Sequence, residues 1–195
     1  ENGITLTLAE LASKMGVTIA RITNHFRTKD QLIVALSDDY EQQYGELHKS
    51  FSKEGRVSLI QLAELMEKVM QLQYEHRCLM LFVCATGISQ DEVYRQISAK
   101  WNSNLQRFKY RIVSLVEGGI LDQSALVSEN LEILRFQYIN LFTTWLVSQT
   151  LYDIDRPLHK SKKIYIKGIL YTFYPYLTRK GKTELEQIIQ DLKKR

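Results

Sequence analysis

Proline is rare in this sequence, and its rarity favours a helical fold. Only Pro157 and Pro175 occur among the 195 residues, and proline is the residue that most strongly breaks helices. Runs that alternate apolar with polar residues, the pattern of half-buried strands, are also few. The sequence therefore predicts an all-α protein.

Cysteines and long apolar runs are scarce as well. Cys78 and Cys84 lie in one apolar stretch, where they fall on different faces of a helix, so we expect no local disulfide. Reduced thiols are typical of a cytoplasmic protein. The longest apolar run, LMLFVCATGI, has about half the length of a membrane-spanning helix, and no secretory signal is visible.

Clusters that suggest catalysis or metal binding are weak. His76, Cys78 and Cys84 lack a fourth zinc ligand and a recognised spacing. The chain has four histidines, and none forms an evident pair with a nucleophile. We therefore expect neither an enzyme nor a bound metal or cofactor.

Capping signals divide the chain into helices. The pairs Thr7–Glu10, Thr28–Gln31, Ser89–Glu92 and Thr183–Glu186 each have the spacing of a capping box. The expected helices are 7–15, 18–25, 28–49, 57–75, 77–88, 91–117, 126–152, 159–178 and 183–194. The loop SKEGR at 52–56 suggests a boundary between an N-terminal domain, 1–50, and a larger domain, 51–195.

Residues 11–32, LASKMGVTIARITNHFRTKDQL, place two short helices around one glycine. A helix-turn-helix needs a small residue where its helices cross, and Ala12 stands there. Gly16 supplies the turn, Val17 fills the corner and Ile22 points back into the crossing. The small core is expected to be closed by Leu8, Leu11, Met15 and Phe26. This spacing predicts a helix-turn-helix.

Positive charge gathers on the second of these helices and just beyond it. The stretch from Lys14 to Lys29 has four basic residues and no acidic one, although the net charge of the chain is only +4. Arg21 can pair bidentately with guanine, and the helix starts at Thr7 and Thr28 offer N–H groups to phosphates. An ordinary helical hairpin with a solvated basic face is the alternative.

The segments NGITLTLAELASKMGVT, ITNHF and TKDQL, between about Glu1 and Leu47, resemble the tetracycline-repressor (TetR) family of bacterial transcription regulators. The resemblance implies base contacts from Ile19, Ala20, Arg21 and Thr23. It implies phosphate contacts from Thr7, Thr18, His25 and Lys29. It also implies a homodimeric repressor that binds a palindromic operator and is released by a small, mostly apolar effector.

Two departures from the family pattern stand out. Thr23 occupies a position where the family usually has tyrosine, which weakens or replaces one contact with DNA. The first helix of the family, which braces the motif, does not precede Glu1. We expect that helix to have been omitted from this segment.

The larger half contains two segments that are apolar around nearly their whole circumference, ILRFQYINLFTTWLV at 133–147 and IYIKGILYTFYPYL at 164–177. Such helices must be buried on more than one side. The second side is expected to meet the same helices of another copy, although a single-chain bundle would also hide it. The expected dimer contacts are Phe136, Ile139, Thr143, Leu146, Ile164, Gly168 and Tyr171.

The effector pocket is placed in the larger half by resemblance alone. Its candidate lining residues are Tyr74, His76, Met80, Phe82, Trp101, Phe108, Tyr138, Phe142 and Trp145, and each can equally be plain core. The polar residues Gln137, Asn140, Thr144 and Gln149 fit the dimer contact as well as a pocket. A helical-bundle enzyme, a ligand carrier and an interaction module that does not bind DNA are the rival functions.

Overall fold

The computed structural model describes residues 6–52, 57–86, 95 and 103–194. Within these ranges the regular elements are helices, apart from one isolated bridge between Leu121 and Leu177. The predicted all-α class is therefore confirmed. In the same ranges, no helix combines the length and the apolar character that a membrane crossing requires.

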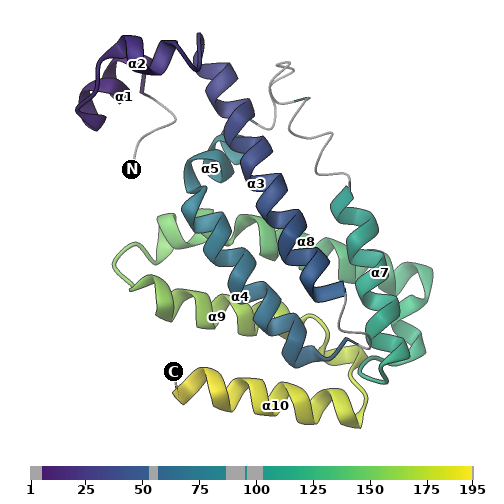
Figure 1. The fold of residues 1–195 in the computed structure, drawn as a ribbon. Helices are drawn as coiled ribbons and strands as arrows, with labels where there is room; N and C mark the ends of the chain where they lie inside the picture. Colours follow the sequence, from purple (N-terminus) through teal and green to yellow (C-terminus); the bar gives the residue numbers. More distant parts are fainter. Residues whose placement is uncertain (1–5, 53–56, 87–94, 96–102, 195) are drawn as a thin grey trace.

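The elements follow one another from a small N-terminal unit into a larger bundle (Figure 1). The helices are α1 Leu8–Met15, α2 Ile19–Thr23, α3 Lys29–Ser52, α4 Leu59–Glu75, α5 Arg77–Thr86, α7 Ser103–Glu117, α8 Ser128–Tyr152, α9 Leu158–Tyr171 and α10 Arg179–Lys194. Two short 3-10 turns, η1 Gln123–Leu126 and η2 Tyr174–Tyr176, complete the order. Helices α1 and α2 lie at one end of the molecule and α10 lies at the other (Figure 1).

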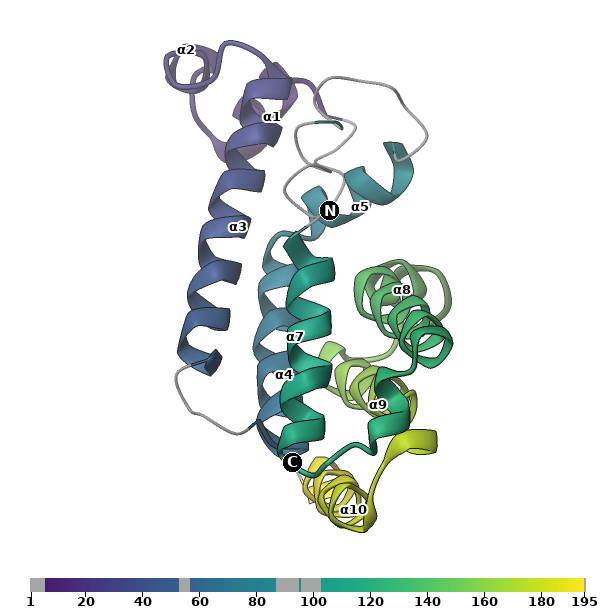
Figure 2. The ribbon, with the colours of Figure 1, turned by 90° about the vertical axis from the view of Figure 1, so that its right-hand side faces the viewer.

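Helix α3 joins the small unit to the bundle. It packs lengthwise against α4 (Figure 2), and its side chains Tyr40 and Tyr44 are buried in the same core as Leu62 and Met66 of α4. This core continues through α8 and α9 to Ile188 of α10. The predicted N-terminal domain, 1–50, is thus attached to the bundle through half of its own longest helix.

The predicted helix boundaries are wrong near the C-terminus. Helix α10 begins at Arg179 rather than at 183, because the hydroxyl of Thr178 accepts a hydrogen bond of 3.1 Å from the N–H of Gly181. Thr183 lies inside the helix, where its hydroxyl donates to the carbonyl of Arg179. The preceding helix ends early, at Tyr171, before the 3-10 turn that contains Pro175. The predicted cap Ser89–Glu92 and the first half of the helix 91–117 fall outside the described residues.

We expect Gly181→Ala to destabilise the bundle. A methyl group at Gly181 would collide with the carbonyl oxygen of Ile120 and lie 2.9 Å from Cδ2 of Leu177. Overpacking of this kind typically lowers the free energy of unfolding by about 1–3 kcal/mol. Chemical denaturation with Gly45→Ala as the control would test this, because a methyl at Gly45 meets nothing within 4 Å. Equal stabilities of the two variants would contradict the close approach of α10.

Candidate nucleic-acid interface

The turn between α1 and α2 has the geometry that the sequence predicts. Gly16 ends α1 in the left-handed region, with φ of 66°, a conformation that glycine adopts without the steric cost of a Cβ. The N–H of Val17 then bonds to the carbonyl of Ala12 at 3.0 Å. Ala12 and Ile22, which are 2% and 9% exposed, are the buried residues of the two helices. The predicted helix-turn-helix is present.

The small core of this unit is more open than predicted. Met15 is 61% exposed, so its assignment to the core is wrong. A crevice of about 330 Å³ lies beside it and leaves one side of the unit uncovered by the described residues. The crevice is lined by Leu11, Met15, Val17, Arg21, Ile22, His25, Phe26 and Leu32.

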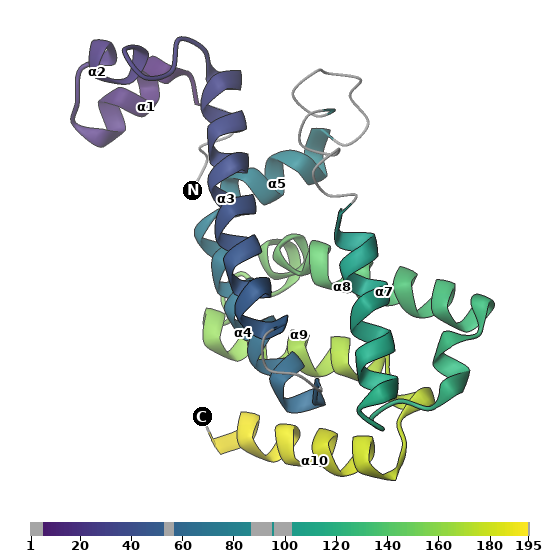
Figure 3. The same cartoon turned by 45° about the vertical axis from the view of Figure 1, so that its right-hand side comes forward.

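The residues predicted to contact bases differ in their accessibility. Ile19, Ala20 and Arg21 are exposed on α2, which lies at the far end of the molecule from the bundle (Figure 3). Thr23 is only partly exposed, and its hydroxyl donates to the carbonyl of Ile19 at 3.2 Å. The hydroxyl of Thr23 is therefore bonded within its own helix, whereas the other three side chains face solvent.

Two of the residues predicted to contact phosphate are helix caps with different hydrogen bonds. The N–H and the hydroxyl of Thr7 donate to Oε2 of Glu10 at 2.7 and 2.8 Å, and these bonds lower the pKa of the Glu10 carboxyl. The predicted capping box is thus formed, and a carboxylate lies at the start of α1. Thr18 caps α2 with no hydrogen bond from its side chain.

The other phosphate candidates, His25 and Lys29, lie in and after the connection from α2 to α3. His25 is exposed and Lys29 is partly buried. The hydroxyl of Thr28 accepts from the N–H of Gln31 at 3.2 Å, as predicted. The Gln31 side chain reaches the N–H of Arg27, at 2.8 Å, instead of that of Thr28.

Comparisons with known proteins agree with this geometry at the level of fold. No family model and no curated protein matches the chain. The crystal structure of a TetR-family transcriptional regulator from Marinobacter aquaeolei VT8 is similar to it, with a TM-score of 0.79. The match covers 96% of this chain and 89% of that chain, at 15% sequence identity. The chain has the TetR-family fold. At this identity the likeness establishes architecture, and function must be argued from the residues.

The TetR-family fold brings three of the predicted effector-pocket residues together. Phe108 of α7 lies 5.3 Å from Tyr138 of α8, and Tyr138 lies 5.5 Å from Phe142, measured between ring centroids. These rings and Trp145 are buried in the core of the bundle. Met80 is also buried in this core, and Trp101 falls outside the described residues.

The remaining pocket candidates lie elsewhere. His76 ends α4, where its Nε2 lies 2.9 Å from Oδ2 of Asp39 and its Nδ1 lies 3.1 Å from the carbonyl oxygen of Leu72. The contact with Asp39 joins the end of α4 to α3. Phe82 lines a crevice of about 130 Å³ shared by α1, α3 and α5. Tyr74 is partly buried beneath the guanidinium of Arg77, at 4.9 Å.

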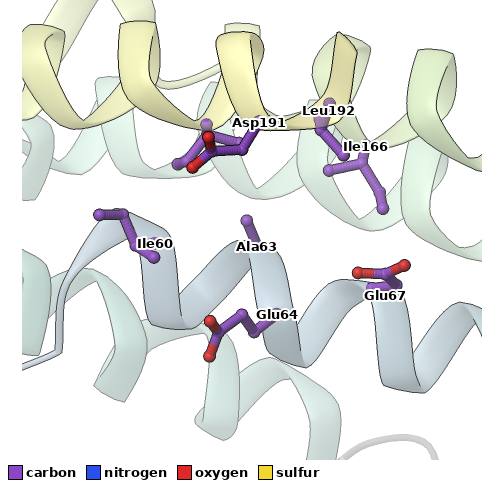
Figure 4. A pocket seen from close by; sticks show the side chains of 8 residues that line it. Ile60, Ala63, Glu64, Glu67, Ile166, Asp191 and Leu192 are labelled. Atoms are coloured by element: carbon purple, nitrogen blue, oxygen red, sulfur yellow. The ribbon is translucent and has the colours of Figure 1, made fainter. Parts of the chain in front are cut away.

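A further crevice lies between α4, α9 and α10 (Figure 4). Its volume is about 70 Å³, and Glu64, Glu67 and Asp191 lie among its apolar side chains, such as Ile60 and Ile166. A space of this size is smaller than the roughly 150 Å³ cavity that accepts benzene. It is not the predicted effector pocket.

Two buried polar residues were missed by the sequence reasoning. Gln73 accepts a hydrogen bond of 2.6 Å from Nε1 of Trp145 and donates to the carbonyl of Phe142. Arg111, only 6% exposed, donates from Nη1 to the hydroxyl of Tyr138 at 2.7 Å. The signal for Arg111 was its position three residues after Phe108, on the apolar face of the helix.

His48 completes this polar group from α3. Its Nδ1 lies 3.3 Å from Nη2 of Arg111. Burial, followed by the charges of Arg111 and Arg107, lowers the pKa of His48 to about 3. The ring is therefore neutral near pH 7, and its Nδ1 accepts a hydrogen bond from Nη2 of Arg111.

The residues predicted at the dimer contact divide into exposed and buried sets. Phe136 of α8 is 68% exposed, and Ile164 and Tyr171 of α9 are each 50% exposed. Gly168 is exposed, and Ile139 and Thr143 are partly exposed. Leu146 is buried in the core of the bundle within one chain, which leaves little of its side chain for a partner. Other apolar residues exposed on or near the same helices are Ile133, Leu141 and Tyr174.

A pH titration tests the neutral state of His48. Its pKa is about 3 in the folded chain, against 6.5 for an ordinary histidine. Between these two pH values the unfolded chain therefore binds a proton that the folded chain does not bind. The free energy of unfolding is therefore expected to fall as pH drops below about 6.5, by up to about 1.4 kcal/mol per pH unit from this group.

Urea denaturation between pH 7 and 4.5 measures this slope. We expect His48→Gln to flatten it, because glutamine cannot take up the proton. His159→Gln is the control, since His159 is exposed on α9. Parallel curves for wild type and His48→Gln would show that His48 is not buried as a neutral ring.

Proposed function

We propose that this protein is a homodimeric transcription regulator. It acts as a repressor that binds a palindromic operator and dissociates from it when a small, mostly apolar effector binds. The observation that carries the proposal is the exposed α2 with Arg21, held by the Gly16 turn at one end of a TetR-family fold. The similar structure from Marinobacter aquaeolei VT8 is described as a transcriptional regulator, which supports the same conclusion.

In the proposed complex, the start of α2 enters the major groove. Ala20 is short enough there for the backbone to approach the bases, Ile19 makes an apolar contact with a base, and Arg21 donates two hydrogen bonds to guanine. Thr18, whose hydroxyl makes no cap bond, donates to a phosphate. Thr23 contributes its methyl group only, because its hydroxyl is bonded within α2.

Phosphates on either side of the groove are held by two helix starts. Lys29 begins α3, where helix N–H groups and positive charge favour an anion, and His25 lies before it, just after the end of α2. At α1 the hydroxyl of Thr7 is already bonded to Glu10. The phosphate there is bound through the backbone N–H groups of Leu8 and Ala9, because that of Glu10 already donates to the Thr7 hydroxyl.

The proposed dimer is formed by α8 and α9, which lie side by side in each copy. A two-fold contact between these helices would cover Phe136, Ile164 and Tyr171, which are exposed in the single chain. The pair would present two copies of α2 to half-sites about one turn of the duplex, roughly 34 Å, apart. This spacing gives the palindromic operator its geometric basis.

A gel-shift assay with DNA from upstream of the protein's own gene tests DNA binding. Wild type is expected to give a sharp complex that weakens steeply as salt is added. Arg21→Ala is expected to weaken it by about tenfold or more, because a bidentate contact with guanine is lost. Arg179→Ala removes the same charge at the start of α10, at the opposite end of the molecule, and is expected to bind normally. Equal binding by both variants, or a smear without sequence preference, would refute the assignment.

Light scattering on a sizing column tests the dimer. Phe136→Glu is expected to give a folded monomer at micromolar concentration, because a charge would be buried without a partner in the contact. Tyr110→Glu is the control, since Tyr110 is 61% exposed on α7 and the variant should stay dimeric. A wild-type protein that runs as a monomer would contradict the proposal.

A further inference from the structure

The guanidinium of Arg111 is a positive charge buried between three helices. Its helix, α7, carries it between Tyr138 of α8 and His48 of α3. Burial keeps the Tyr138 phenol neutral by raising its pKa, against the opposing effect of the arginine. The neutral imidazole of His48 is the second partner. Arg111 therefore bonds to two neutral groups.

A second arginine lies on α7 one turn before Arg111. This residue, Arg107, places its guanidinium 5.1 Å from the ring centre of Tyr44, and the pKa of Tyr44 also responds to Arg111 and to the carboxylate of Glu41. Within the described ranges, Arg111 has no carboxylate at ion-pair distance. A buried cation without a counter-charge is costly.

Arg111 has further N–H groups that can donate hydrogen bonds. A guanidinium has five N–H donors, and Arg111 uses one on Tyr138 and one on His48. The other donors suit the two oxygens of a carboxylate, which bind an arginine through parallel hydrogen bonds. The guanidinium lies 5.7 Å from the ring centre of Tyr138, and the rings of Phe108 and Phe142 pack against Tyr138. The combination suits an apolar molecule that ends in an acid group.

We propose that the larger domain binds apolar carboxylic acids, and that Arg111 receives their carboxylate. The inference rests on the proposed function, because it gives the effector a chemical class. A carboxylate that binds the unused donors also pulls the guanidinium toward itself and away from His48. Since His48 lies on α3, the helix that begins at the DNA-binding unit, loss of this bond frees the buried end of α3 to move.

A purely structural Arg111 makes a different prediction for the ligand-free protein. If its two hydrogen bonds held the helices together, Arg111→Met would lower the melting temperature markedly. A residue kept for binding is instead often replaced by an apolar one of similar volume without loss of stability. We expect Arg111→Met to melt at or above the wild-type temperature.

Matched acids and amides test the site directly. The probes are benzoate, phenylacetate, 2-naphthoate and octanoate, each paired with its neutral amide, at pH 7 and constant ionic strength. We expect at least one acid to raise the melting temperature of wild type by several degrees and to show saturable heat on titration, while its amide does neither. Arg111→Met should lose the response, and Arg179→Met, the surface control, should keep it.

Several results would overturn the proposal. They are a wild-type response to none of the acids, equal responses to acid and amide, and an undiminished response in Arg111→Met. If Arg111→Met fails to fold by circular dichroism, Arg111→Lys decides, because it keeps the charge but loses the bidentate geometry and should bind the acid at least tenfold more weakly. An unchanged affinity in Arg111→Lys would refute the contact.

The gel shift separates this inference from the proposed function. A protein that forms a sharp complex with DNA but binds no acid would remain a regulator with another effector. If the protein binds acids through Arg111 but does not bind DNA, the acid-binding site is supported and the proposed function as a regulator is refuted. Release of DNA by the acid in wild type, and not in Arg111→Met, is the outcome expected if both proposals are correct.

Discussion

Helix α3 is the physical link on which the rest of the structure depends. Its first turn lies beside the helix-turn-helix, and its tyrosines Tyr40 and Tyr44 are buried against α4 and α7 side chains. The backbone hydrogen bonds of an α-helix resist bending, so a shift at the buried end of α3 is carried to its start. A site in the bundle can therefore influence the position of α2 without any direct contact between them.

Polar groups buried in the bundle give α3 a defined position. Gln73 joins α4 to α8 through Trp145, and Arg111 joins α7 to α8 and to His48 of α3. Buried polar atoms need partners because they have lost their bonds to water. Such bonds are specific in geometry, so they select one arrangement of helices where apolar packing would tolerate several.

Local features of this fold were predictable because they depend on neighbours in the sequence. The Gly16 turn and the Thr7–Glu10 capping box involve residues within a few positions of each other. The start of α10 was not predictable in this way, since Thr178 and Thr183 can both cap a helix. Helix α10 is capped by Thr178 and packs closely against the backbone of Ile120. This close contact is possible because Gly181 has no side chain.

The sequence by itself determined the helical class, the helix-turn-helix and the stretch from Lys14 to Lys29 that holds four basic residues and no acidic one. Only the tertiary structure decided that Met15 is exposed, that Leu146 is core, and that Arg111 is buried beside His48 and Tyr138. The physical reason is that helical periodicity defines a face but not what covers it. Burial depends on helices remote in the chain, and it also decides which polar groups need a partner.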